Sequence, residues 1–169
     1  MSATPSATAG QAHGTSSTSR DRTTVSVLLY SDNITVRDTV RAAVGRRPAR
    51  DVEVGSWLEC ATAPAVETAV EGGDFDLLIL DGEAAKTGGM GLCRTLKSEI
   101  YRCPPVLVLT GRPQDGWLAT WSLADAVVPH PIDAVTLADT VATLARTGQS
   151  ATVRPEAITD EGRPGPDAD

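Results

Sequence analysis

Three apolar segments of this chain end in side chains that could do chemistry. The first ends in the carboxylate of Asp81, the second ends in the hydroxyl of Thr110, and the third is followed closely by the imidazole of His130. Ligands of open α/β sheets bind at the carboxyl ends of the strands. If the three segments are neighbouring parallel strands, these side chains meet at one edge of a sheet and form a candidate site for binding or catalysis.

The elements that would position these side chains alternate between strand-like and helix-like patterns. Short apolar runs, typical of buried strands, are separated by segments in which apolar residues recur at helical spacing. The expected strands are 25–30, 52–54, 75–80, 105–109 and 126–128, and the expected helices lie within 34–44, 65–71, 92–100, 117–123 and 135–145. Continuous apolar strands separated by single helices require a parallel sheet covered on both faces. The sequence therefore predicts an α/β fold, a doubly wound five-stranded parallel sheet of the flavodoxin-like type with strand order 2-1-3-4-5.

The segments on either side of this domain contain too few apolar residues to build a core. Residues 1–23 are mostly Ser, Thr, Ala and Gly, and residues 148–169 are polar, acidic and rich in Pro and Gly. Such segments cannot bury enough apolar surface to offset the entropy lost on ordering. We therefore expect one domain over 24–147, between a disordered N-terminal tail and a disordered acidic C-terminal tail.

Composition and charge exclude several classes of function. The net charge of -7 argues against nucleic-acid binding, which needs a basic face. No apolar stretch reaches the ~18 residues of a membrane-spanning helix, and the N-terminus lacks the apolar region of a signal peptide, so we expect a cytoplasmic protein. The three cysteines match no metal or redox spacing and are expected to be reduced thiols packed as small apolar groups.

The predicted domain resembles the receiver domain of bacterial response regulators. In that family an aspartate that ends the third strand accepts a phosphoryl group, and Asp81 stands at this position. An acid pair after the first strand helps to hold Mg²⁺, and here the pair is Ser31-Asp32, which leaves Asp32 and Asp81 as the implied metal ligands. A hydroxyl that ends the fourth strand contacts the phosphoryl group, and Thr110 matches it.

Two further positions depart from the family pattern. The family places a lysine before a proline after the fifth strand, where this chain has His130-Pro131, and the resemblance implies a cis bond there. An imidazole is not a permanent cation near neutral pH, as a lysine is. The two lysines of the chain do not replace it, because Lys86 is expected in a solvated loop and Lys97 lies far along a helix. The aromatic switch residue of the family corresponds to Val127.

These departures leave two interpretations of the site open. Asp81 is either a working phosphoacceptor or a relic carboxylate that forms hydrogen bonds across the crevice, and we favour the second because a phosphorylation switch needs acceptor, metal and readout together. Thr110 either contacts a phosphoryl group or is a buried hydroxyl bonded to the backbone. His130 either senses phosphate or pH, or only fills space between two prolines, and we favour the simpler role.

Trp117 and Trp121 are one helical turn apart in a chain with only 4% aromatic residues. Their spacing places both side chains on one face of the expected fourth helix. They either pack against the sheet or anchor a partner, because tryptophan is enriched in interface hot spots. The resemblance adds weight to the second role, since this region of receiver domains is a common contact face.

Three functions remain open at this point. The first is an orphan pseudo-receiver without an output domain, which is not an enzyme, requires no cofactor and binds a larger protein complex as an accessory subunit. The first host considered is respiratory NADH:quinone oxidoreductase (complex I), at the cytoplasmic face of the membrane. The second is a single-domain response regulator that a histidine kinase phosphorylates on Asp81 with Mg²⁺. The third, a small-molecule-binding flavodoxin-like domain, lacks a Gly-rich phosphate loop after the first strand.

Overall fold

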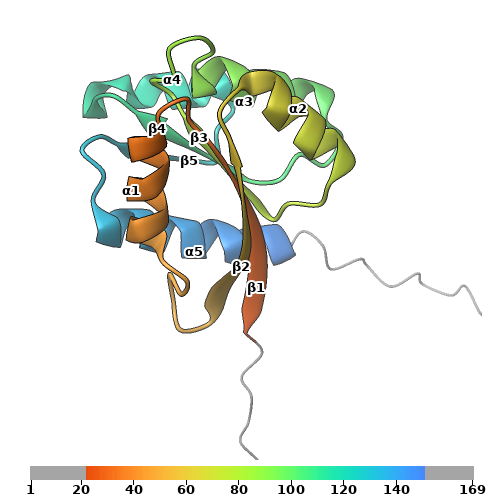
Figure 1. Cartoon of the computed structure of the whole chain (residues 1–169), viewed down its shortest axis with the longest axis vertical. Coiled ribbons are helices and arrows are strands. Elements are labelled where there is room, and N and C mark those ends of the chain that lie inside the picture. Colours follow the sequence, from red (N-terminus) through yellow and green to blue (C-terminus); the bar gives the residue numbers. More distant parts are fainter. Residues whose placement is uncertain (1–21, 151–169) are drawn as a thin grey trace, which may run out of the picture.

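Strands and helices alternate along the described part of the chain (Figure 1). The structure, a computed structural model, describes residues 22–150, so the predicted disorder of the two tails falls on segments that lie almost entirely outside the described residues. The strands are β1 (Thr23–Tyr30), β2 (Val52–Cys60), β3 (Leu77–Asp81), β4 (Val106–Thr110) and β5 (Ala126–Pro129). The helices are α1 (Ile34–Val44), α2 (Ala63–Gly72), α3 (Gly89–Glu99), α4 (Gly116–Ser122) and α5 (Ala134–Ser150), with the short 3₁₀ turn η1 (Pro113–Asp115) before α4.

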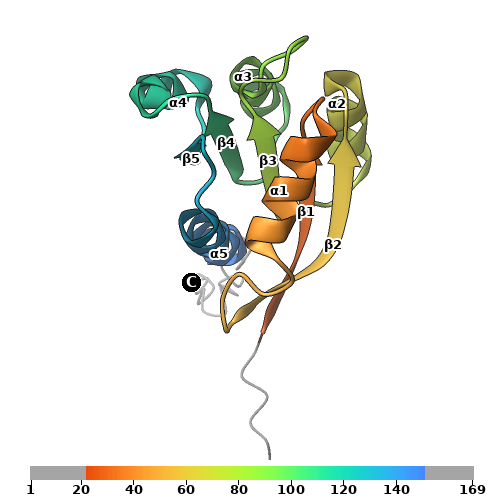
Figure 2. The same cartoon turned by 60° about the vertical axis from the view of Figure 1, so that its left-hand side comes forward.

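The five strands form one parallel sheet in the order β2-β1-β3-β4-β5, which confirms the predicted fold class. Side chains of successive strand residues point to opposite faces. In β3, Leu77 and Ile79 join the core under α1 and α5, while Leu78 and Leu80 join the core under α2 and α3. Helices α1 and α5 pack against each other on their side of the sheet (Figure 2). This two-sided burial leaves the carboxyl ends of the strands as the place for a site.

Local hydrogen bonds set the ends of α1. The side chain of Asn33 accepts a hydrogen bond of 2.9 Å from the backbone N–H of Thr35 and caps the N-terminus. At the other end Gly45 has a φ of 62°, in the left-handed region, and its N–H bonds the carbonyl of Arg41 at 2.9 Å. The helix is therefore fixed at both ends by residues whose types favour those positions.

The second strand is longer than predicted. The sequence predicts a short strand over 52–54, but β2 continues to Cys60. Gly55 forms a bulge at which the pairing of β1 shifts, so that Val25 faces Val54 and the next residue faces Ser56. A Cβ atom at Gly55 would lie 2.6 Å from the Cγ2 atom of Thr24, so any larger residue would force the Thr24 side chain to shift.

The last helix also extends beyond the predicted end of the domain. The expected boundary was residue 147, whereas α5 continues to Ser150. Gly148 lies close to Pro105, since an added Cβ atom would come within 3.3 Å of the proline ring. No helix within residues 22–150 has the length and apolar content that crossing a bilayer requires.

The cysteines behave as their scattered spacing predicted. All three are free thiols; Cys60 and Cys93 are buried and Cys103 is half-buried. Burial raises the pKa of each thiol, and that of Cys93 reaches about 11. These thiols are therefore protonated near neutral pH and pack as small apolar groups.

Candidate functional site

A cavity of about 400 Å³ lies at the carboxyl ends of the strands, where the predicted site residues meet. Its lining residues are Asp32, Asn33, Val36, Asp81, Glu83, Ala85, Gly111 and His130. The structure thus brings together three of the four predicted phosphate and metal contacts. The fourth, Thr110, is completely buried at the end of β4.

Asp81 is 2% exposed, and both of its carboxylate oxygens accept hydrogen bonds. The hydroxyl of Ser31 donates to Oδ2 at 2.7 Å, and the backbone N–H of Glu83 donates to Oδ1 at 3.0 Å. A buried carboxylate is costly unless such donors satisfy it. Ser31 therefore has a specific role beyond the absence of an acid: its hydroxyl stabilises Asp81 where a second carboxylate would repel it.

Asp32 and Tyr30 connect the end of β1 to the loop that follows β3. Asp32 is exposed, and its Oδ2 accepts the N–H of Ala85 at 2.8 Å. The Tyr30 hydroxyl donates to the carbonyl of Thr87 at 2.7 Å. Burial raises the pKa of Tyr30, and the charges of Asp32 and Asp81 raise it further, so the hydroxyl keeps the proton that it donates. Two hydrogen bonds thus hold the β3–α3 loop against β1.

Glu83 reaches across the cavity to the loop after β4. One of its carboxylate oxygens, Oε1, accepts the backbone N–H of Gly111 at 3.1 Å. The carboxyl carbon lies so near that a Cβ atom at position 111 would be 2.6 Å from it. Sequence reasoning passed over Glu83 as a loop residue. Two features of the sequence could have indicated this contact. Glu83 is an acid two residues after Asp81, and Gly111, directly after Thr110, leaves room for its carboxylate.

Thr110 and His130 lie beside each other at the ends of β4 and β5, and their roles as phosphoryl contacts remain predictions. The Thr110 hydroxyl donates to the carbonyl of Arg112 at 3.3 Å and is satisfied by the backbone. His130 is half-buried, lines the cavity and donates its backbone N–H to the carbonyl of Thr110 at 2.7 Å. The peptide bond between His130 and Pro131 is cis, as the resemblance implied.

The three carboxylates that line the cavity have no lysine or arginine beside them among the lining residues that the structure describes, although Arg37 donates to the carbonyl of the neighbouring Ser31 at 2.6 Å. Lys97 instead pairs with Asp125 at 2.6 Å, while Lys86 is exposed in its loop. Among the described residues, the cavity lining therefore offers no lysine or arginine for direct contact with a phosphoryl group.

The donor set fits a resident Mg²⁺ ion poorly. Mg²⁺ is commonly held by one or two carboxylates together with water and phosphate oxygens. Asp32 and Asp81 would be those carboxylates, and three of their four oxygens each accept one hydrogen bond from the chain, with which an ion would compete. Within residues 22–150, no group of three or more His, Cys, Asp or Glu side chains is arranged to hold a metal ion.

The two tryptophans lie on the surface and do not pack into the core. Trp117 is 69% exposed and Trp121 is 50% exposed, and the neighbouring Leu123 is 50% exposed. The guanidinium of Arg94 lies 4.9 Å from the centre of the Trp121 ring and donates to the carbonyl of Trp121 at 2.5 Å. This apolar surface on α4 is available for contact, and its role as a partner interface remains a prediction.

The strand order and the aspartate that ends β3 in a cavity at the sheet edge define a receiver domain. This chain belongs to the response regulatory proteins. It is 50% identical over 124 residues to two uncharacterized response regulatory proteins of Mycobacterium tuberculosis, from strains CDC 1551 / Oshkosh and ATCC 25618 / H37Rv. The match covers 73% of this chain and 93% of each relative. No protein-family model matches the chain.

Solved structures agree on the fold. The receiver domain of a Francisella response regulator has a TM-score of 0.60 at 14% identity, and covers 73% of this chain and 98% of its own. A CheY-like receiver domain protein of Methanospirillum hungatei JF-1 has a TM-score of 0.59 at 16% identity, and covers 75% of this chain and 98% of its own. At these identities the likeness concerns the fold alone.

Proposed function

We propose that this protein is a pseudo-receiver that binds a partner protein as an accessory subunit and is not an enzyme. The observation that carries this proposal is that no lysine or arginine lines the acceptor cavity among the described residues, where the family places a lysine. Phosphoryl transfer depends on positioning and on stabilisation of negative charge. A cavity without a lysine or arginine in its lining does not stabilise the negative charge of a transferring phosphoryl group.

The contacts of Glu83 support the same conclusion. Its carboxylate accepts the N–H of Gly111, a residue that lines the cavity, so this donor is already used. Two like unit charges ~4 Å apart repel by about 4 kcal/mol at an effective dielectric constant of ~20, and solvent in the open cavity reduces this value. A phosphoryl group on Asp81 would therefore have to displace or neutralise Glu83.

The exposed tryptophans support a binding role. Trp117 and Trp121 present large apolar side chains on one helix, and such side chains dominate the energy of protein interfaces. The first assembly to test is respiratory NADH:quinone oxidoreductase (complex I). Binding to it would place the protein at the cytoplasmic face of the membrane through a protein complex.

Affinity purification of the tagged protein from its native host tests this proposal. The wild-type chain and Asp81→Asn are expected to recover the same defined complex, because binding does not depend on phosphorylation. The double variant Trp117→Ala, Trp121→Ala is expected to lose it. Tyr101→Ala, which removes another exposed aromatic side chain (91% exposed), is the matched control and should retain it. Recovery of the bait alone from the wild type would contradict the proposal.

A phosphorylatable single-domain response regulator is the second candidate. The position of Asp81 at the end of β3, inside the cavity, favours it. It would require a histidine kinase as partner and Mg²⁺ at Asp32 and Asp81. Incubation with Mg²⁺ and beryllofluoride or a phosphoryl donor, followed by mass and tryptophan fluorescence, distinguishes the two candidates. A stoichiometric adduct that disappears in Asp81→Asn would establish the second and exclude the first.

A further inference from the structure

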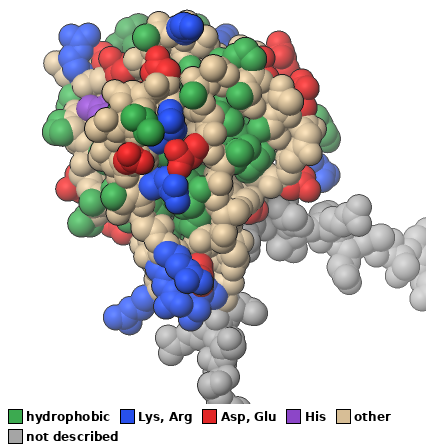
Figure 3. Space-filling model, in the orientation of Figure 1, with side chains coloured by type: hydrophobic (Ala, Val, Ile, Leu, Met, Phe, Trp, Pro, Cys, Tyr) green, Lys and Arg blue, Asp and Glu red, His purple; other side chains and the backbone are tan. Residues whose placement is uncertain are grey.

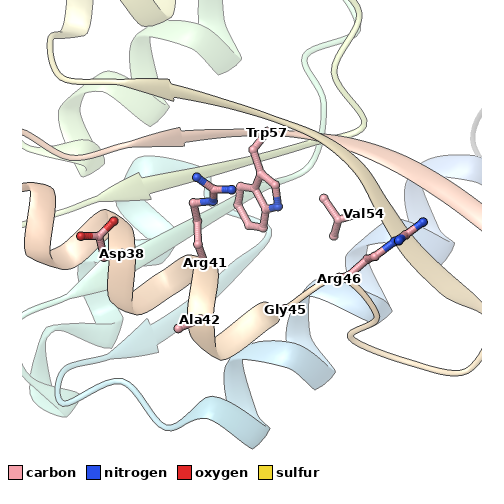
Figure 4. A pocket seen from close by; sticks show the side chains of 7 residues that line it. All are labelled: Asp38, Arg41, Ala42, Gly45, Arg46, Val54 and Trp57. Atoms are coloured by element: carbon pink, nitrogen blue, oxygen red, sulfur yellow. The ribbon is translucent and has the colours of Figure 1, made fainter.

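A second cavity, of about 410 Å³, lies between α1 and the edge strand β2, and we call it the α1–β2 groove. Its lining residues are Asp38, Arg41, Ala42, Gly45, Arg46, Val54 and Trp57. It shares no residue with the acceptor cavity. Figure 4 shows Arg41 beside the Trp57 ring and Arg46 on the other side of Val54. The groove therefore has an apolar floor between two guanidinium groups.

The groove lies in a positively charged region of an acidic protein. Arg22, Arg46 and Arg47 all pair with Glu53, at N–O distances of 3.6, 2.7 and 3.9 Å. Nearby, Arg37 and Arg41 share Glu59, at 3.1 and 2.7 Å. Five guanidinium groups thus share two carboxylates, and Asp38 in the groove lining adds a third negative charge, so positive charge is in excess. Figure 3 shows Lys and Arg side chains gathered at the lower end of the molecule, where Figure 1 places the start of β1 and the connection from α1 to β2.

These guanidinium groups have donors left for a ligand. The side chain of Arg46 is 80% exposed and that of Arg41 is 49% exposed. Each guanidinium carries five N–H donors, and its bonds to one carboxylate use only part of them. Arg41 also lies 5.9 Å from the centre of the Trp57 ring, which is half-buried. The groove can therefore bind carboxylates and an apolar side chain at the same time.

The position of β2 favours an extended ligand. This strand is nine residues long and stands at the edge of the sheet, with β1 as its strand neighbour. An edge strand offers backbone N–H and C=O groups to an added strand. A continuous polyphosphate is a poorer match, because Glu53 and Glu59 stand between the arginines and would repel its phosphates.

We propose that the α1–β2 groove binds an extended acidic segment of a partner protein. Carboxylates of that segment pair with Arg41 and Arg46, and one apolar side chain packs on Trp57 and Val54. This binding does not depend on the state of Asp81, and it uses a different surface from Trp117 and Trp121. Its failure would therefore leave the proposed accessory role untouched.

Fluorescence anisotropy with the full chain tests the proposal. The probe is a fluorescein-labelled peptide of about ten residues, enough to cover β2 at ~3.3 Å per residue, rich in Asp, Glu and Ser with one central leucine. The expected result is saturable binding that weakens from low salt to ~0.15 M salt and is lost when Gln and Asn replace its acids. A benzophenone in place of the leucine should cross-link to the segment that contains Val54 and Trp57.

Matched variants locate the binding. The double variant Arg41→Gln, Arg46→Gln should bind the probe about fivefold or more weakly than the wild type. The change is modest because each exposed ion pair contributes modestly. Arg102→Gln is the control, because Arg102 also lies 5.9 Å from an aromatic ring, that of Tyr101, but outside the groove. The affinity of Arg102→Gln for the probe should equal that of the wild type. Thermal unfolding of each variant verifies that it is folded.

Four results would overturn the proposal. The first is absence of probe binding, and the second is a double variant that binds the probe as tightly as the wild type does. The third is a single-stranded oligonucleotide of the same length that binds more tightly than the probe. The fourth is a peptide with the sequence of residues 151–169 that displaces the probe at lower concentrations than the unlabelled probe peptide does. The third result would assign the groove to nucleic acid. The fourth would assign it to the acidic segment of this chain itself.

Discussion

The hydrogen bond from Ser31 to Asp81 leads to a stability prediction that can be worked out from the structure. Ser31→Ala removes the 2.7 Å donor from Oδ2 of a carboxylate that is 2% exposed, and leaves the N–H of Glu83 as its remaining described donor. It also removes the acceptor of the Asn33 N–H, at 3.1 Å, just before α1. A hydrogen bond to a charged group contributes about 1.5–3 kcal/mol. Water that enters the open cavity can replace part of it, so we expect a loss of about 1–2 kcal/mol.

Urea and thermal unfolding measure this loss. For a domain of this size the expected decrease in Tm is about 3–8 °C. In an Asp81→Ala background the same serine substitution should cost much less, because no buried carboxylate is left to satisfy. Ser98→Ala is the matched control, since the Ser98 hydroxyl bonds a carbonyl on an exposed helix surface, and it should change stability little. Equal losses from Ser31→Ala in both backgrounds would refute the assigned role of Ser31.

Three further predictions concern other parts of the chain. Glu83→Ala frees the N–H of Gly111 and removes a like charge, so calorimetry should detect beryllofluoride binding to this variant in the presence of Mg²⁺ at concentrations where the wild type shows none. Gly55→Ala forces a Cβ atom to within 2.6 Å of a side chain of β1 and should destabilise the fold by about 1–3 kcal/mol in urea unfolding, whereas Gly91→Ala, with open space around it, should not. The hydrogen bond from Arg146 lowers the pKa of Asp51 from 3.8 to about 2, so the pair stabilises the fold above pH 4 and this contribution is lost as pH falls towards 2. Arg146→Gln should return the pKa of Asp51 towards 3.8 in an NMR titration.

Most of the fold could be predicted from local pattern. The apolar runs that become β3 and β4 are buried on both faces, and such runs are recognisable without knowledge of their neighbours. The length of β2 could not be predicted, because Gly55 acts there as a bulge against Thr24, a residue far away in sequence. Local glycine and serine resemble a strand end, and only the pairing with β1 shows otherwise.

The candidate site was predictable to the same extent. Asp32, Asp81 and His130 converge as expected, because parallel strands bring their carboxyl ends to one edge. The contacts of Glu83 and Ser31 were missed, since they join residues 28 and 50 positions apart. Sequence pattern reports which residues end the strands, whereas the hydrogen-bond partners depend on loop conformations that tertiary contacts fix.

The two hydrogen bonds that hold the β3–α3 loop have a consequence for regulation. Tyr30 bonds Thr87 and Asp32 bonds Ala85, so both contacts must break before that loop can rearrange. If they persist in the cell, the protein has one binding-competent shape at all times. Occupancy of its partner would then follow the number of copies synthesised and degraded, by simple mass action. Control would lie with gene expression and turnover instead of with a chemical signal received by the domain.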